Sequence, residues 1–217
     1  MSLSIRPATP DDRDTLAGLA YDTGYFGDSA SRYFPDRELF AAFWTDPYLR
    51  GGLGNLIALR QPDSLSGEAS LQPVGFIVGS ANPARYRRGL LRATPLLLSR
   101  LGGPDTRRSL RYLLRTARYP GPHASDSLYP AHLHLNVRRD ARGLGAGTAL
   151  LRAHLNLLRK AGVPGVQLST TTENVAALGL YRKLGFRVAD ERETPLWQPW
   201  LGRPARHVVM TRSLLED

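Results

Sequence analysis

The sequence predicts an α/β protein, and three features of its 217 residues carry that prediction. Short β-branched stretches with a two-residue period alternate along the chain with longer stretches of helical apolar spacing. The segment AHLHLNV, residues 131–137, alternates strictly, and a glycine-rich turn and a helix-forming run follow it directly. No internal repeat or linker divides the chain. We therefore expect residues 1–217 to form one domain.

The first third of the chain predicts a strand, two helices and a hairpin. Residues 4–6 have the pattern of a short strand, and Pro10 starts a helix with two aspartates in its first turn, where the helix dipole favours them. Apolar spacing predicts a second helix over residues 37–45. Residues 55–60 and 74–80 are apolar and β-branched and are separated by a turn-rich linker, so we expect an antiparallel hairpin.

A basic region lies between residues 81 and 120, where ten arginines face a single acid, Asp105, within a chain of net charge +10. Pro95 interrupts its first apolar run. Residues 106–119 predict an amphipathic helix whose arginines lie opposite one apolar face. That predicted face comprises Leu110, Leu113, Leu114 and Ala117. We expect a helical insertion over about residues 81–125, most simply with a solvated arginine face. A nucleic-acid partner is disfavoured but left open.

The second half of the chain alternates strands and helices. After the strand at 131–137 we expect a helix over 145–161, a strand over 165–170, a helix over 174–184 and closing strands over 186–189 and 206–212. Gly162 and Pro164 end the first of these helices, whereas Asn174 caps the start of the second and Gly185 its end.

Composition excludes several classes of protein. The chain has no cysteine, which rules out disulfides, a thiol nucleophile and zinc–thiolate sites. It has no apolar run of 18 residues, and its first residues lack the apolar core of a signal peptide. His132 and His134 share a strand face, but no third ligand accompanies them, so we expect no metal site. We expect a cytoplasmic protein without a membrane partner, either monomer or homodimer.

The turn after residue 137, ARGLGAGT, has the character of an anion-binding loop. Free N–H groups at a helix N-terminus carry partial positive charge, and glycines let a ligand approach them closely. A P-loop lysine is absent, and Thr148 stands where a dinucleotide loop needs its third glycine. The pattern that remains is Arg142-x-x-Gly145-x-Gly147. Either it holds a phosphate-bearing ligand, or it is a glycine-rich turn with nothing bound.

Together with the segment NVAALGLYRKLGF at residues 174–186, this loop resembles the GCN5-related N-acetyltransferase (GNAT) family. The resemblance implies a mixed central β-sheet flanked by helices, with the basic helical insertion before the central strand. In the first half, the TGYFGD turn at residues 23–28, Pro47-Tyr48-Leu49 and the AHLH run look like a narrower branch. That branch is the acetyltransferase-like domain of O-GlcNAcase and its free-standing bacterial relatives.

The resemblance implies acetyl-CoA as the cosubstrate. The cofactor-binding residues that it implies are Leu135, Asn136, Val137, Arg142, Gly143, Leu144, Gly145, Ala146, Gly147, Thr148, Asn174 and Tyr181. The implied reaction is transfer of the acetyl group to a primary amine by direct attack in a ternary complex. The alternative is a catalytically silent acyl-CoA-binding module that acts as a sensor or scaffold.

The residues with catalytic roles follow from the same resemblance. Tyr181 would hydrogen-bond the leaving thiolate, and the backbone N–H of Val137 would stabilise the oxyanion. His134 is the leading general base, although strand alternation sets it on the opposite face from Val137 unless a bulge intervenes. Asp28 and Glu173 are the other candidate bases.

The acceptor amine is left open by the sequence. Several aromatic residues of the first half are either core or the wall of an acceptor pocket. These are Tyr25, Phe26, Tyr33, Trp44 and Tyr48. Trp197 and Trp200, in a proline-rich stretch near the C-terminus, are placed at the border of the same site.

Overall fold

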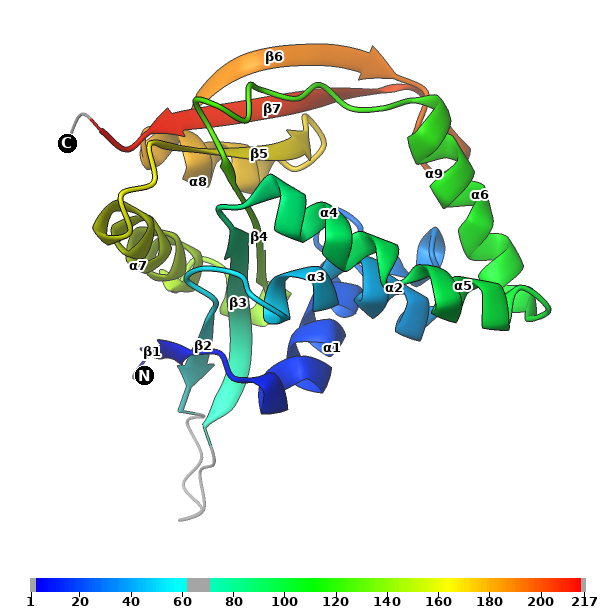
Figure 1. The fold of residues 1–217 in the computed structure, drawn as a ribbon, viewed down its shortest axis with the longest axis horizontal. Coiled ribbons are helices and arrows are strands. Elements are labelled where there is room, and N and C mark those ends of the chain that lie inside the picture. Colours follow the sequence, from blue (N-terminus) through cyan, green and yellow to red (C-terminus); the bar gives the residue numbers. More distant parts are fainter. Residues whose placement is uncertain (1–2, 62–70, 216–217) are drawn as a thin grey trace.

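The fold was taken from a computed structural model that describes residues 3–61 and 71–215 (Figure 1). One sheet has the strand order β1-β2-β3-β4-β5-β7-β6. Its strands are β1 Leu3–Pro7, β2 Leu56–Arg60, β3 Gln72–Ser80, β4 Ala131–Val137, β5 Gly165–Thr171, β6 Arg187–Thr194 and β7 Ala205–Ser213. Only β4 and β5 pair in parallel. The predicted mixed sheet and the antiparallel hairpin are confirmed, and most of the linker between β2 and β3 lies outside the described residues.

Helices cover both faces of this sheet. They are α1 Arg13–Thr23, α2 Arg37–Trp44, α3 Asp46–Leu49, α4 Pro83–Leu91, α5 Thr94–Arg100, α6 Pro104–Arg118, α7 Ala146–Lys160, α8 Val175–Lys183 and α9 Gln198–Leu201. Helix α7 packs on β2, β3 and β4 from one side, and α1 packs on β3 and β4 from the other. Within the described ranges, no helix combines the length and apolarity needed to cross a bilayer.

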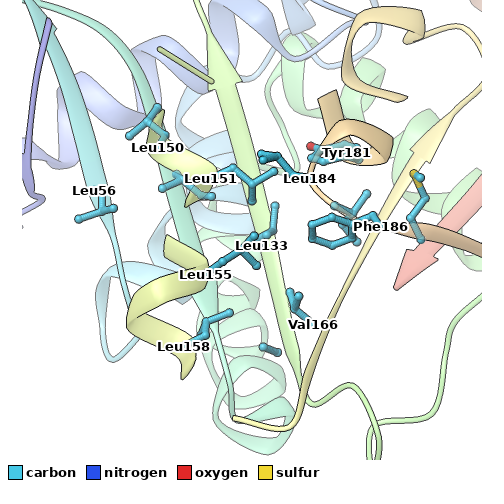
Figure 2. Close-up of a cluster of buried hydrophobic side chains, with 14 of the residues drawn as sticks. Leu56, Leu133, Leu150, Leu151, Leu155, Leu158, Val166, Tyr181, Leu184 and Phe186 are labelled. Carbon is cyan, nitrogen blue, oxygen red and sulfur yellow. The ribbon is translucent and has the colours of Figure 1, made fainter. Parts of the chain in front are cut away.

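Two cores lie on the opposite faces of the sheet. The aliphatic core, shown in Figure 2, packs Leu150, Leu151, Leu155 and Leu158 of α7 against strand residues such as Leu133. The aromatic core on the other face gathers rings from α1–α3, α6 and the chain before α9. The strict alternation of β4 explains this division, because Leu133 enters the aliphatic core while His132 and Asn136 contact Tyr48 and Thr23 on the other side.

Strands β4 and β5 separate soon after they begin. Only Ala131↔Val166 and His132↔Gln167 pair, whereas β4 stays in register with β3 as far as Val137. No bulge therefore turns His134, and it lies on the face opposite Val137. The N–H of Arg138 donates to the Val74 carbonyl at 2.9 Å, on the β3 side. Because successive N–H groups point to opposite edges, those of Leu135 and Val137 point into the gap toward β5.

The basic insertion contains the expected amphipathic helix, α6, but the predicted apolar face was wrong. The buried residues of α6 are Thr106, Ser109 and Tyr112, and Leu114 is 68% exposed. The buried face is polar because it meets the carboxylate and backbone of Asp36. The Oγ1 of Thr106 donates to Asp36 Oδ2 at 2.5 Å, and the Asp36 N–H donates to Ser109 Oγ at 3.1 Å.

Candidate functional site

A groove of about 400 Å³ opens where β4 and β5 separate, between the first turns of α7 and α8. We call it the loop groove. Its walls include the residues predicted to bind a cofactor, apart from Leu144, whose side chain is 47% exposed outside the lining. The lining residues that this prediction named are Leu135, Asn136, Val137, Arg142, Gly143, Gly145, Ala146, Gly147, Thr148, Asn174 and Tyr181.

The glycine turn is built for close approach to backbone. Gly143 and Gly145 adopt left-handed conformations, with φ of 78° and 85°, and Gly145 is the N-cap of α7. A Cβ at either position would meet no protein atom within 4 Å, so the space beyond both is open. The N–H groups of the first turn, from Ala146 to Thr148, have no partner within the helix. The turn therefore presents donors to the loop groove.

Electrostatics favour an anion in the loop groove. Arg142 and Lys183 line it, and no carboxylate does so among the residues that the structure describes. The Arg142 guanidinium is positioned by its donation to the Gly27 carbonyl at 3.3 Å and to the Val137 carbonyl at 3.4 Å. Two cations and a helix N-terminus at one end of a groove form an environment typical of phosphate binding.

Helix α8 contributes two polar groups without partners. Asn174 holds the N-cap position, as predicted, but its side chain makes no capping hydrogen bond, so its amide is available to a ligand. Tyr181 is 6% exposed and lies at the edge of the aliphatic core beside Leu184 and Phe186 (Figure 2). Its hydroxyl has no hydrogen-bond partner in the described part of the chain. Burial raises the pKa of Tyr181 well above its ordinary value, so this hydroxyl stays protonated and is a hydrogen-bond donor at neutral pH.

A second cavity of about 260 Å³ adjoins the loop groove, and we call it the aromatic cavity. The two share a boundary of Thr23, Leu135, Asn136, Asn174 and Tyr181. Of the predicted acceptor-pocket aromatics, Phe26, Tyr33, Trp44 and Trp197 line this cavity. Tyr25 and Trp200 pack against those rings outside the lining.

His134 separates the aromatic cavity from a third cavity of about 290 Å³, the histidine cavity. The histidine cavity is also lined by His132, Tyr48, Tyr86, Arg87, His123 and Asp126. Burial lowers the pKa of His134 to about 4, so the imidazole is neutral at pH 7. Burial, and then the nearby His134, lowers the pKa of His132 to about 4 as well. The Nδ1 of His132 is hydrogen-bonded to the Tyr48 hydroxyl at 3.0 Å.

The two carboxylates considered as bases lie away from these walls. Asp28 is half exposed and pairs with Arg139 at 3.0 Å, and Glu173 pairs with Arg203 at 2.8 Å. Neither lines the loop groove, the aromatic cavity or the histidine cavity. Of the candidate bases, only His134 lines the space that adjoins Tyr181.

Several residues that line these spaces were not predicted from the sequence. Thr23 lines both spaces, and its hydroxyl accepts from Asn136 Nδ2 at 2.8 Å while it donates to the Leu19 carbonyl at 2.6 Å. Tyr112 reaches the aromatic cavity from the basic insertion. Lys183 was visible only as one of two lysines in the chain. Helical spacing places Lys183 two residues beyond Tyr181, but only the fold turns it toward the groove.

The fold and the loop groove define a class of protein. A model of the acetyltransferase (GNAT) family matches residues 119–186, which span β4, the glycine turn, α7, β5 and α8. The seven-stranded sheet with flanking helices is the GNAT fold. The family model and the solved structures together support the GNAT family for this chain.

Individual relatives agree with this class. N-acetyltransferase 8B from Homo sapiens is 36% identical over 64 residues, covering 30% of this chain and 28% of that protein. The crystal structure of SsHAT superposes with a TM-score of 0.60 at 24% identity, covering 100% of both chains. The structure of yncA from Salmonella typhimurium, solved with its cofactor acetyl-CoA, superposes with a TM-score of 0.58 at 15% identity. It covers 100% of this chain and 96% of that chain.

Proposed function

We propose that this chain, acting as one domain, is an acetyl-CoA-dependent N-acetyltransferase that transfers the acetyl group to a primary amine by direct attack in a ternary complex. One observation carries the proposal. The anion-binding loop groove and the aromatic cavity are neighbouring spaces that meet at Tyr181 and Asn136. A donor held by its phosphates and an acceptor held by its body would therefore meet at that boundary. Kinship with the O-GlcNAcase-like branch remains a prediction from the first-half motifs.

The residues of the loop groove suit acetyl-CoA. Its pyrophosphate would lie on the N–H groups of the first turn of α7, with Arg142 and Lys183 supplying positive charge. Its pantetheine amides would pair with the open edge of β4 and with the free Asn174 amide. The thioester would then lie beside Tyr181. Acetyl-CoA supplies the activated acetyl group, and the chain supplies orientation and proton handling.

The acceptor amine must lose a proton for the reaction to balance. An acceptor that starts as the ammonium ion loses one proton before the attack. The neutral nitrogen then attacks the thioester carbonyl, the C–N bond forms, the C–S bond breaks to release the CoA thiolate, and the nitrogen loses a second proton as the amide forms. An alkylammonium has a pKa of about 10.4, so at pH 7 about one part in 10³ to 10⁴ is neutral. His134 borders the acceptor space in its neutral form and accepts this proton. A positioned base contributes up to about 10²–10⁴-fold when its pKa lies near the working pH, and the pKa of about 4 places His134 at the low end of this range.

Because its pKa is low, His134 is better suited to passing a proton on than to keeping it. A buried imidazole with a pKa of about 4 holds a proton weakly and passes it on. The histidine cavity on its other side provides the exit, with the Tyr48–His132 hydrogen bond and the His123–Asp126 pair along its wall. The proton therefore leaves through the histidine cavity, which shares no lining residue with the loop groove.

The oxyanion and the leaving thiolate need donors. The N–H of Val137 points into the gap between β4 and β5, where the carbonyl oxygen of the thioester would lie, and such a donor contributes about 3–4 kcal/mol. Tyr181 donates a hydrogen bond to the sulfur. Full proton transfer from Tyr181 is uphill, because its raised pKa exceeds the value of about 8.5 for a thiol.

The test is release of free thiol from acetyl-CoA by the purified chain with a panel of amines. Tyr181→Phe removes one hydroxyl and keeps the ring. We expect kcat to fall about 10- to 100-fold while the Kd for acetyl-CoA stays within about twofold, because the hydrogen bond forms mainly in the transition state. Acetyl-CoA binding without thiol release for any amine, unaffected by Tyr181→Phe, would instead identify a silent acyl-CoA-binding sensor or scaffold.

A further inference from the structure

The walls of the aromatic cavity carry information about the acceptor. Rings from four separate parts of the chain meet there, and the cluster is tight. The ring centroids of Tyr33 and Tyr112 are 4.6 Å apart, those of Tyr33 and Trp197 5.0 Å, and those of Phe26 and Trp197 5.0 Å. Tyr112 comes from α6, so the basic insertion supplies one wall of the site. Such walls favour a flat ring, which gains edge-to-face and stacking contacts beyond simple burial.

The charge of the lining narrows the acceptor further. Among the described residues, no aspartate, glutamate, lysine or arginine side chain lines the aromatic cavity, and burial lowers the pKa of both histidines that line it, His134 and His207. One ammonium group can be accommodated by aromatic faces. A second charge, as in a polyamine or a free amino acid, would be desolvated without a counterion, which is strongly unfavourable. These walls therefore favour a monoamine without a carboxylate.

Polar atoms without partners lie in the same walls. The indole Nε1 of Trp197 and the hydroxyl of Thr171 are buried and have no hydrogen-bond partner in the described part of the chain. His207 Nδ1 is also buried and without a partner in the described part of the chain, but its ring packs against Gly121, so we give this atom less weight. An unsatisfied buried donor is costly, and an indole N–H can only donate. Neither the Trp197 nitrogen nor the Thr171 oxygen is accessible to solvent, so a ligand oxygen that accepts from Trp197 after a small shift of the wall side chains would remove this cost.

We propose that the acceptor is a small aromatic monoamine that carries a hydroxyl or another oxygen acceptor, bound with its ring against the wall that Tyr33, Tyr112 and Trp197 form and its amine toward Tyr181. This proposal names the substrate class and rests on the proposed acetyl transfer. The volume of about 260 Å³ is below the usual range for drug-sized ligands, so the cavity suits a molecule of one or two rings.

The experiment compares six amines in the thiol-release assay with saturating acetyl-CoA. They are tyramine, 2-phenylethylamine, 2-cyclohexylethylamine, glucosamine, spermidine and Nα-acetyl-lysine. We expect kcat/KM to be highest for tyramine, and about tenfold or more lower for glucosamine, spermidine and Nα-acetyl-lysine. The cyclohexyl analogue has the size of 2-phenylethylamine without its π-system, and it should be the poorer substrate. Faster turnover of spermidine, glucosamine or Nα-acetyl-lysine than of tyramine would overturn the proposal.

Two variants test the polar part of the site. Trp197→Phe keeps a ring but removes the indole donor, and Thr171→Val removes a hydroxyl at nearly constant volume. Each should reduce the preference for tyramine over 2-phenylethylamine by about tenfold, because only tyramine offers an oxygen. Trp200→Phe is the matched control, since Trp200 packs on Trp197 outside the lining and should leave the ratio unchanged. An unchanged ratio in both test variants would reject the oxygen acceptor. A folding defect lowers both rates together and leaves the ratio intact.

Fluorescence separates failure of this proposal from failure of the transferase. All three tryptophans of the chain pack in the aromatic core, so their emission reports occupancy of the cavity. Saturable quenching by tyramine in the absence of acetyl-CoA binding would reject the transferase and retain the ligand class. Acetyl-CoA binding without any tyramine quenching or turnover would retain the cofactor and reject the aromatic amine.

Discussion

At the scale of single residues, the site combines buried groups whose properties are set by their surroundings. Tyr181 and His134 both lie in low-dielectric walls, and burial shifts them in opposite senses. The pKa of the phenol rises and that of the imidazole falls, so both are neutral at pH 7. In the proposed reaction, Tyr181 is therefore a neutral hydrogen-bond donor and His134 a neutral proton acceptor.

The buried histidines also predict acid sensitivity. His132 and His134 have pKa values of about 4 in the folded chain and about 6.5 when unfolded, so the unfolded state binds more protons between those values. Stability is therefore constant above about pH 6.5 and falls as the pH drops toward 4. Each histidine contributes on the order of 1–2 kcal/mol to the loss between pH 7 and pH 5.

Urea unfolding at pH 7 and pH 5 checks this. His134→Leu should reduce the loss of unfolding free energy on acidification, and the surface variant His123→Ala should keep it. The ion-paired Asp12 does not contribute to the loss of stability between pH 7 and pH 5. Arg6 holds the pKa of Asp12 below its ordinary value, so its contribution is lost only at more acidic pH. Equal acid sensitivity in wild type and His134→Leu would refute the assignment.

Some residues of the site could be predicted from the sequence, and others could not. The loop residues were predictable because glycine spacing before a helix has one main physical use, which is backbone contact with an anion. Tyr112 was not, because a tyrosine among arginines on an amphipathic helix carries no signal of its direction. Thr23 was missed for a similar reason, since its role depends on Asn136, which is 113 residues distant in the chain.

At the scale of elements, the order of strands and helices followed from periodicity, but contacts between elements did not. The amphipathic pattern of α6 was correctly predicted, yet its buried face is rotated toward Thr106, Ser109 and Tyr112. Tertiary partners decided this, because the buried carboxylate of Asp36 needs donors. The spacing of apolar residues cannot predict that α6 packs on a polar group. That group, Asp36, is the N-cap residue of α2 and lies about 70 residues earlier in the chain.

Asp36 links the insertion to the rest of the fold, and its removal should loosen that link. Its carboxylate accepts from Thr106, from Leu39 N–H at 3.0 Å and from Arg100 Nε at 3.0 Å. Burial opposes its ionisation, but these donors outweigh that cost and keep its pKa below the ordinary value. We expect Asp36→Ala to lower the free energy of unfolding by about 2–4 kcal/mol and to speed proteolysis between α5 and α6.

Urea titration and limited trypsin digestion measure both effects. Asp105→Ala is the control, because Asp105 is an exposed partner of Arg108 at 3.9 Å and its loss should change stability by less than about 0.5 kcal/mol. If Asp36→Ala and Asp105→Ala were equally stable and equally resistant to trypsin, the insertion would be held by its aromatic contacts alone.

At the scale of the whole molecule, the separation of two strands of the sheet creates the site. Strands β4 and β5 pair over two residues and then separate. The loop groove and the aromatic cavity meet beside this gap. The glycine turn and α7 lie at one end of this gap, the aromatic core with α6 lies on the other face, and Tyr181 stands between them. Figure 1 shows α7 and α6 on opposite sides of β4, and the glycine turn and the aromatic walls thus come from distant parts of the chain to one boundary.

We propose that the glycine turn binds acetyl-CoA. Calorimetric titration of acetyl-CoA into wild type, Gly145→Glu and Gly162→Glu tests this proposal. The two glycines are matched, because both have positive φ, 85° and 69°, both face open space, and they lie at opposite ends of α7. Both substitutions therefore introduce the same backbone strain, of about 1–2 kcal/mol, and the same charge. Only Gly145→Glu places a carboxylate in the loop groove.

We predict micromolar binding, about −8 kcal/mol, by wild type and by Gly162→Glu, with no detectable binding by Gly145→Glu. Absence of binding by the wild type, or equal binding by all three proteins, would contradict the account.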